Sequence, residues 1–128
     1  MAKKHESSFE ITGWEETDLV DGDVRVYRTD VGKRFSGDIE GTSEAWLVMT
    51  ITPSGPAAYV GLEVLDVSIG ERHGTFVLKH DATATSDGQE ASWVVVSGSG
   101  TGELAGIEGA AHIERQVDGS HTFTLTLE

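Results

Sequence analysis

Along most of this 128-residue chain, apolar residues alternate with polar ones or form short runs rich in β-branched residues. Glycine next to aspartate, serine or proline interrupts these runs at regular intervals, as in strands joined by tight turns. The pattern predicts eight strands, at residues 8–14, 24–35, 39–52, 57–69, 75–85, 91–97, 111–117 and 120–127. Apolar spacing of three and four residues never persists for three turns, so we expect little or no helix.

Short strands following one another in this way imply an antiparallel meander, and closing the meander into a barrel removes its exposed edges. We therefore expect an all-β fold, a closed antiparallel eight-stranded barrel that forms one domain over residues 1–128. Residues 1–6 are expected to be a flexible N-terminal extension, and the acidic, aperiodic segment 14–23 a loop. A barrel of this size is just wide enough to be filled by side chains or to hold one small ligand.

Turn chemistry indicates which residues share a face, because a short hairpin loop determines which residues oppose each other. A turn at residues 87–88 sets His80 opposite Val95, and an even loop around residues 71–72 sets Glu63 opposite His80. A turn at residues 54–55 sets Trp46 opposite Glu63. A weaker turn at residues 37–38 sets Tyr27 opposite Val48, and one at 118–119 groups His112 and Glu114 with His121 and Phe123.

One predicted face is aromatic and surrounds an acid and a base, so we interpret it as the interior. Its apolar members are Tyr27, Phe35, Trp46, Val48, Tyr59, Leu65, Phe76, Leu78, Trp93 and Val95. Glu63 and His80 lie among them. The interior and exterior faces could be exchanged, because the assignment rests only on the aromatic residues and this polar pair.

The other predicted face is too apolar for the solvated surface of an ordinary monomer. It carries Ala45, Leu47, Met49, Ile51, Val60, Leu62, Val64, Val77, Val94 and Val96. We expect a second copy of the chain to cover it, giving a homo-oligomer joined through barrel walls. The alternative is that the N-terminal strand and loop fold over this face.

Composition narrows the classes of partner. Lys and Arg number 9 against 22 Asp and Glu, a net charge of −13, which disfavours nucleic acid and anionic membrane surfaces. Cysteine is absent, which excludes disulfides, thiolate metal sites and a cysteine nucleophile. No secretory signal or membrane-spanning run is recognisable, so a cytoplasmic location is expected.

Glu63 and His80 are the candidate catalytic residues, because a coupled acid and base on an apolar face could move protons near neutral pH. Glu63 would be the proton acceptor or electrostatic stabiliser, and His80 its partner acid or orienting group. The predicted ligand-binding wall comprises Tyr27, Trp46, Tyr59, Phe76, Leu78 and Trp93. The alternative is that the pair only satisfies buried polar groups.

Other chemistries have weaker support. His112, Glu114 and His121 could converge, but they lack a recognised metal spacing, so no metal site is predicted. The glycine-rich segment 98–109, GSGTGELAGIEG, has neither the lysine nor the following helix of a phosphate loop. Its glycines are expected to serve turns, bulges and close backbone approach. No cofactor is expected.

Five blocks resemble a bacterial family. They are RFSGDIEG (34–41), YVGLE (59–63), GTFVLKHDAT (74–83), GSGTGELAGIEG (98–109) and the final HTFTLTLE. Together, in this order, they resemble proteins grouped as domain of unknown function 3224, over nearly the whole chain. That family is similar to the allene oxide cyclase barrel superfamily, which includes plant cyclases and dirigent proteins.

The resemblance implies a closed eight-stranded barrel. In the cyclase relatives, such a barrel binds a lipid-like substrate and directs its ring closure without a cofactor, aided by an interior glutamate. Glu63 is similar to that glutamate in character, but no motif aligns the two, so the role is not carried over.

Three hypotheses follow. The first is an oligomeric barrel that binds a small, mainly apolar organic molecule, acting as a cofactor-independent cyclase or isomerase. The second is a non-catalytic carrier or sensor with the same cavity. The third is a structural barrel with a filled core, which would lack a cavity of about 300 Å³ or more.

Overall fold

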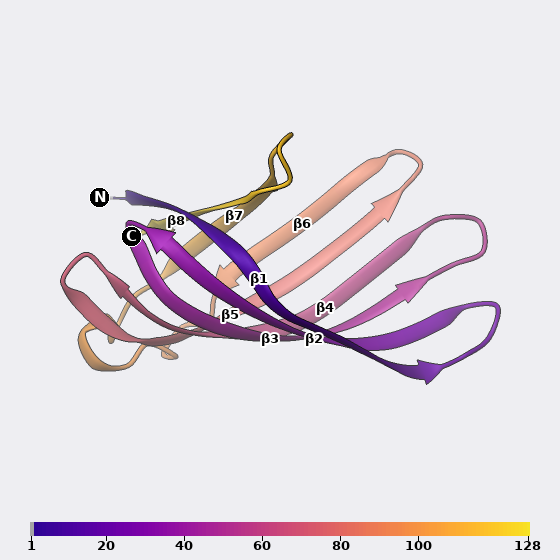
Figure 1. The fold of residues 1–128 in the computed structure, drawn as a ribbon, viewed down its shortest axis with the longest axis horizontal. Helices are drawn as coiled ribbons and strands as arrows, with labels where there is room; N and C mark the ends of the chain where they lie inside the picture. Colours follow the sequence, from indigo (N-terminus) through magenta and orange to yellow (C-terminus); the bar gives the residue numbers. More distant parts are fainter. Residues whose placement is uncertain (1) are drawn as a thin grey trace.

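The strands form a closed barrel in which buried and exposed residues alternate along most strands. The computed structural model describes residues 2–128, in which eight antiparallel strands pair in chain order and β8 closes on β1 (Figure 1). The strands are β1 (Lys3–Val20), β2 (Arg25–Gly37), β3 (Ile39–Ile51), β4 (Ala57–Ile69), β5 (Arg72–Thr85), β6 (Gly88–Val95), β7 (Gly109–Arg115) and β8 (His121–Leu127). The only helical element in the described residues is a 3-10 turn, η1 (Gly102–Leu104). The predicted fold class is therefore confirmed.

The barrel is fully closed at one end only. β1 pairs with β8 from Lys3–Leu127 to Phe9–His121, and β1 continues beyond this pairing alongside β2 alone. β6 and β7 share only two register pairs, of which Trp93–Ala111 is nearer the open end. Beyond these pairs the hairpins diverge, so the barrel widens into an open mouth (Figure 1).

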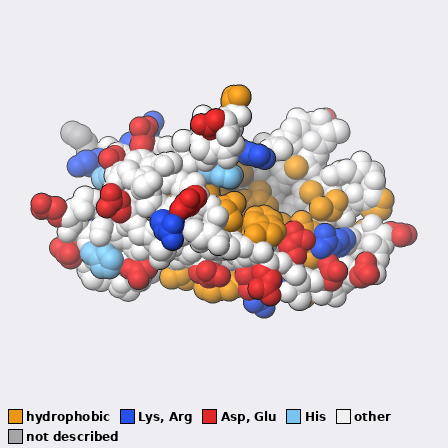
Figure 2. All heavy atoms as spheres, viewed as in Figure 1, with side chains coloured by type: hydrophobic (Ala, Val, Ile, Leu, Met, Phe, Trp, Pro, Cys, Tyr) orange, Lys and Arg blue, Asp and Glu red, His pale blue; other side chains and the backbone are white. Residues whose placement is uncertain are grey.

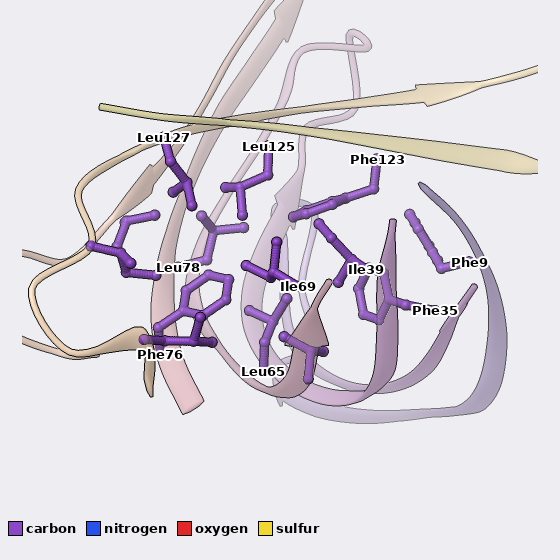
Figure 3. Packing of buried hydrophobic residues seen from close by; sticks show 14 residues of the cluster. Phe9, Phe35, Ile39, Leu65, Ile69, Phe76, Leu78, Phe123, Leu125 and Leu127 are labelled. Carbon is purple, nitrogen blue, oxygen red and sulfur yellow. The ribbon is translucent and has the colours of Figure 1, made fainter. Parts of the chain in front are cut away.

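The hydrophobic core fills the closed end. Its buried members are Phe9, Phe35, Ile39, Leu65, Val67, Ile69, Phe76, Leu78, Val95, Leu104, Ile107, Phe123, Leu125 and Leu127, which meet from all sides of the barrel (Figure 3). The loop between β6 and β7 inserts Leu104 and Ile107 into this core. The interior of this end is therefore filled by the chain's own side chains.

The glycines of that loop permit close backbone approach, as predicted. A Cβ on Gly100 would collide with the carbonyl oxygen of Leu104, and a Cβ on Gly74 of β5 would collide with that of Thr101. The Thr101 amide donates to the Thr75 carbonyl at 2.8 Å. The loop between β6 and β7 therefore packs across the closed end of the barrel.

The first strand is longer than predicted. Segment 14–23 was expected to be a loop, yet β1 extends to Val20 and pairs with β2. Arg25 bonds Asp18 at 2.8 Å and Glu16 at 3.2 Å, so cross-strand ion pairs replace the hydrophobic alternation that the prediction required. Residues 3–6, expected to be an extension, pair with β8; Met1 lies outside the described residues.

β3 faces the opposite way from the prediction. Its inward residues are Ala45, Leu47, Met49 and Ile51, whereas Trp46 and Val48, predicted to be interior, point outward. The turns before and after β3 each contain five residues that do not pair across the turn: 36–40 between β2 and β3, and 52–56 between β3 and β4. Both turns were assumed to be even, and because the two errors cancel, the faces of β2 and β4 were predicted correctly.

No helix among residues 2–128 combines the length and apolar character needed to cross a membrane.

Candidate functional site

A buried polar cluster, defined as Lys33, Ser43, Glu63 and His80, lies inside the barrel on the mouth side of the core. Each residue comes from the inward face of a different strand, in order β2, β3, β4 and β5. His80 Nε2 lies 2.8 Å from Glu63 Oε1, and Lys33 Nζ donates to the same oxygen at 3.2 Å. The Ser43 hydroxyl donates to Glu63 Oε2 at 2.5 Å. Both oxygens of this fully buried carboxylate are therefore bonded.

The cluster keeps Glu63 ionised. Burial alone would raise the pKa of this carboxyl group, but the hydrogen bond from His80, the positive charges of Lys33 and His80 and the hydrogen bond from Ser43 act against it. Together they lower the pKa of Glu63 to about 2. A carboxylate held this strongly is a poor proton acceptor and a good electrostatic anchor.

Two buried ring nitrogen atoms make no hydrogen bond of regular geometry within residues 2–128. They are Nδ1 of His80 and Nε1 of Trp93, which belong to register partners on β5 and β6; the Trp93 indole also lies against the Tyr59 hydroxyl, where burial raises the pKa of that group and the hydrogen bond from the indole acts to lower it. Since Glu63 is ionised, the ring hydrogen of His80 is assigned to Nε2 from this hydrogen-bond network. Among the described residues, Nδ1 then has no partner in either charge state of the ring, as an N–H donor when the ring is charged and as a lone pair when it is not.

Sequence reasoning found half of this cluster. Glu63 and His80 were predicted to share the inward face, and they do, although the register differs by two: Glu63 pairs with Leu78 and His80 with Gly61. Lys33 was missed, although its spacing of two from Phe35 on β2 places it on the same predicted face. Ser43 was missed because the faces of β3 were inverted.

A cavity of about 430 Å³ occupies the mouth of the barrel, on the open side of the polar cluster. Its apolar lining includes Tyr27, Met49, Tyr59, Ala82, Ala84, Ala91, Trp93 and Ile113. Figure 2 shows hydrophobic side chains gathered in this hollow between the diverging hairpins. The cavity opens to solvent and is large enough for a small organic molecule.

The predicted wall residues are divided between three environments. Tyr27, Tyr59 and Trp93 line the cavity. Phe76 and Leu78 are fully buried in the core at the closed end and do not line it. Trp46 lies on the outer face and is 41% exposed.

Two basic side chains lie on one wall of the mouth. Arg115 and His121 are a register pair of β7 and β8 and both line the cavity. His121 stacks on Phe9 at 4.9 Å between ring centroids, and Lys33 Nζ lies 4.5 Å from the centroid of the same Phe9 ring. A column of three side chains thus connects the rim with the polar cluster.

The grouping of His112 and Glu114 with His121 and Phe123 is wrong. A loop over residues 116–120 separates β7 from β8, and its odd length pairs Ile113 with Phe123 and points His112 and Glu114 outward. Within residues 2–128, no group of three or more acidic or histidine side chains is arranged to hold a metal ion.

Comparison with known proteins places the chain in a group without an assigned activity. The model of the family described as "Protein of unknown function (DUF3224)" matches residues 5–127. A crystal structure of a DUF3224 protein of unknown function from Shewanella oneidensis MR-1 is 27% identical. It superposes with a TM-score of 0.87 over 100% of this chain and 98% of that one. No curated protein matches the sequence.

Proposed function

We propose that this chain, which belongs to the DUF3224 family, binds a small, mainly apolar organic molecule in the mouth of its barrel. The observation that carries the proposal is the open cavity of about 430 Å³ lined by Tyr27, Tyr59, Trp93 and small apolar residues. Ligand sites are typically concave, mostly apolar and between about 300 and 1,000 Å³. The proposal includes the similarity to the allene oxide cyclase barrels that the resemblance of the five sequence blocks implies.

The division of the barrel supports binding over a purely structural role. Two buried hydrophobic clusters stabilise the fold without filling the mouth: the core at the closed end, and a smaller cluster of Val31, Ala45 and Leu47 on β2 and β3. Ala82, Ala84 and Ala91 keep the space open where larger apolar residues would close it. A ligand would bury the aromatic faces that the mouth leaves in contact with water.

Two oppositely charged residues line the cavity, Glu90 of β6 and Arg115 of β7, and we assign the acidic group of the ligand to Arg115. Arg115 and His121 point inward from the same wall, and Arg115 makes no ion pair within residues 2–128. A carboxylate placed here could accept bidentate hydrogen bonds from the guanidinium while its apolar chain lies against Tyr59 and Trp93. This arrangement would orient the ligand with its polar end toward solvent.

Calorimetric titration with decanoic acid and with 1-decanol tests both parts of the proposal. Both compounds should bind, and Arg115→Gln should weaken decanoate binding roughly tenfold, as expected for loss of a charged hydrogen bond, while leaving decanol unchanged. Arg34→Gln is the matched control, because Arg34 pairs with Glu10 on the outer surface. Failure of decanol to bind would overturn the cavity proposal; failure of decanoate alone, or equal effects of the two variants, would overturn the role of Arg115.

A second candidate, cofactor-independent isomerisation, rests on the unpartnered Nδ1 of His80, which is buried and is not among the residues that line the cavity, so it requires the substrate to reach below that lining. Glu63 would hold the ring and stabilise its charged form, while Nδ1 takes a proton from a carbon next to a carbonyl group and returns it to another carbon. The Trp93 N–H could donate to the enolate oxygen. Burial raises the pKa of the Tyr59 hydroxyl, which therefore also stays a donor.

A β,γ-unsaturated cyclic ketone tests this candidate, since its conjugated isomer is measured by absorbance. His80→Gln should abolish conversion and preserve decanol binding. Glu63→Gln should reduce conversion and spare binding if it folds. Absence of conversion, or conversion that persists in His80→Gln, would discard the isomerase and leave the binding proposal intact.

A further inference from the structure

An apolar stripe runs along the outer face of β3 and β4. We define the outer stripe as Trp46, Val48, Val60 and Leu62, which are 41%, 41%, 54% and 48% exposed. Trp46 pairs with Leu62 and Val48 with Val60, so the four side chains form a contiguous block. Val64, 37% exposed, extends it toward the closed end. Apolar blocks of this kind are unusual on monomers and mark association sites.

Charged residues flank the stripe in an alternating pattern. In one row, Arg28 of β2 pairs with Val48, Val48 with Val60, and Val60 with Asp81 of β5. In the next row, Asp30 of β2 pairs with Trp46, Trp46 with Leu62, and Leu62 with Lys79 of β5. The first row therefore reads positive, apolar, apolar, negative, and the second reads the reverse.

This pattern is complementary to itself. A second copy placed face to face, about a two-fold axis parallel to β3 and β4, sets its β5 over the β2 of the first copy. Each row of one copy then lies over the same row of the other copy in reversed order. As a result, every cation in the two rows faces an anion of the other copy, and Trp46 faces Leu62. Such a contact is isologous, the kind that closes into a dimer.

We propose that two copies of this chain form a dimer through the outer stripe. Within one subunit Arg28 already donates to Asp30 at 2.8 and 2.9 Å. In the dimer Asp81 of the partner subunit approaches Arg28 and Lys79 of the partner subunit approaches Asp30, so this pair becomes part of a network of four charges, and the apolar block is buried between two such networks. Complementary charges matter here, because two copies at −13 each otherwise repel. Lys79 and Asp81 are exposed and make no ion pair within residues 2–128, so both are free to pair across the interface.

The occupant is a second copy and not an unrelated protein because the flanks match this chain in sign and in spacing. The stripe also lies on the outer wall, whereas the mouth cavity opens inside the barrel. Dimerisation therefore leaves the proposed ligand site accessible. The two proposals are independent and can fail separately.

Sedimentation velocity with charge-exchanged variants tests the dimer. Exchanging one flank, as Lys79→Asp with Asp81→Lys, keeps composition and net charge but places like charges opposite each other, and should raise the dimer dissociation constant at least tenfold. Exchanging the other flank as well, as Arg28→Asp with Asp30→Arg, restores complementarity and should restore the dimer. Leu62→Glu should give a monomer.

The matched control exchanges the exposed pair Glu10 and Arg34, as Glu10→Arg with Arg34→Glu, and should leave the dimer intact. A monomeric wild type, or a trimer, would overturn the proposal, since neither contains a two-fold contact. Dimers that persist in both Leu62→Glu and the single-flank exchange would show that the interface lies elsewhere and would also overturn it.

Discussion

His80 Nε2 and Glu63 Oε1 lie 2.8 Å apart, although the two residues are not register partners on β4 and β5. Gly61 occupies the position opposite His80 and carries no side chain that could block the imidazole. The ring thus reaches the carboxylate two residues further toward the core. This diagonal contact places the polar cluster between the packed end of the barrel and its open mouth.

Removing the charge of Glu63 should destabilise the barrel. Glu63→Gln leaves the buried Lys33 ammonium without its counter-ion, a change that typically costs about 3 to 5 kcal/mol of unfolding free energy. Urea unfolding measures the loss. Glu10→Gln is the control, because the Glu10–Arg34 pair is exposed and its removal should change stability by less than about 1 kcal/mol. Equal effects would contradict a buried ion pair.

The contribution of Glu63 should depend on pH in a defined window. The folded pKa of about 2 lies below the ordinary value of 4.5, so the unfolded chain binds this proton first as pH falls. The stability difference between wild type and Glu63→Gln should therefore be full above about pH 4.5 and decline as pH approaches about 2. Comparing the two proteins removes the shared effect of other carboxylates. A difference independent of pH would show that the carboxylate is not preferentially stabilised.

Filling the mouth should abolish binding without unfolding the protein. Ala82 lines the cavity and pairs with Ala91, so Ala82→Phe places a ring where the ligand would lie. Decanol affinity should fall at least tenfold. Ala105→Phe, in the exposed loop at the closed end, is the control and should bind normally. Unimpaired binding by Ala82→Phe would place the ligand elsewhere.

Gly61 should not tolerate a side chain. A Cβ at this position would collide with the Trp46 carbonyl oxygen and lie 2.9 Å from the Leu47 Cα, both part of the paired β3 strand. Gly61→Ala should therefore lower the unfolding free energy by roughly 3 kcal/mol or prevent folding. Gly13→Ala meets nothing closer than 3.8 Å and should be within about 1 kcal/mol of wild type. Thermal unfolding of both variants decides the matter.

Truncating Leu104, which the loop between β6 and β7 inserts into the core at the closed end, should create a cavity. Leu104 is fully buried in the core, so Leu104→Ala should cost about 2 to 5 kcal/mol. Val117→Ala removes a fully exposed side chain and should have almost no effect. A small effect at Leu104, measured by urea unfolding, would mean that the loop contributes little to closing the barrel.

The sequence allowed the strand count and the barrel to be predicted because alternation and glycine-rich turns are local signals. The face of each strand depends on whether a turn has an odd or even number of residues. The turn after Ile69 has two residues, and the relative faces of β4 and β5 were predicted correctly. The turn at 52–56 has five, and Trp46 was assigned to the wrong face.

The site was harder to predict for related reasons. Glu63 and His80 were found together because their shared face survives a register error of two. The mouth cavity was not localised, since it depends on how far β6 and β7 separate, and hydrophobic alternation carries no information on that. Arg115 was missed because a single odd turn inverted β7 relative to β8.

The most direct test of ligand binding in the mouth uses the indole N–H signals of the three tryptophans in a nitrogen-15 NMR titration with decanol. Trp93 lines the cavity, whereas Trp46 lies on the outer wall and the Trp14 N–H donates to Glu16. Single tryptophan-to-phenylalanine variants assign the signals. Binding in the mouth predicts a saturable shift of the Trp93 signal while the other two stay in place. An unmoved Trp93 signal at saturating decanol, or shifts confined to Trp14 or Trp46, would contradict it.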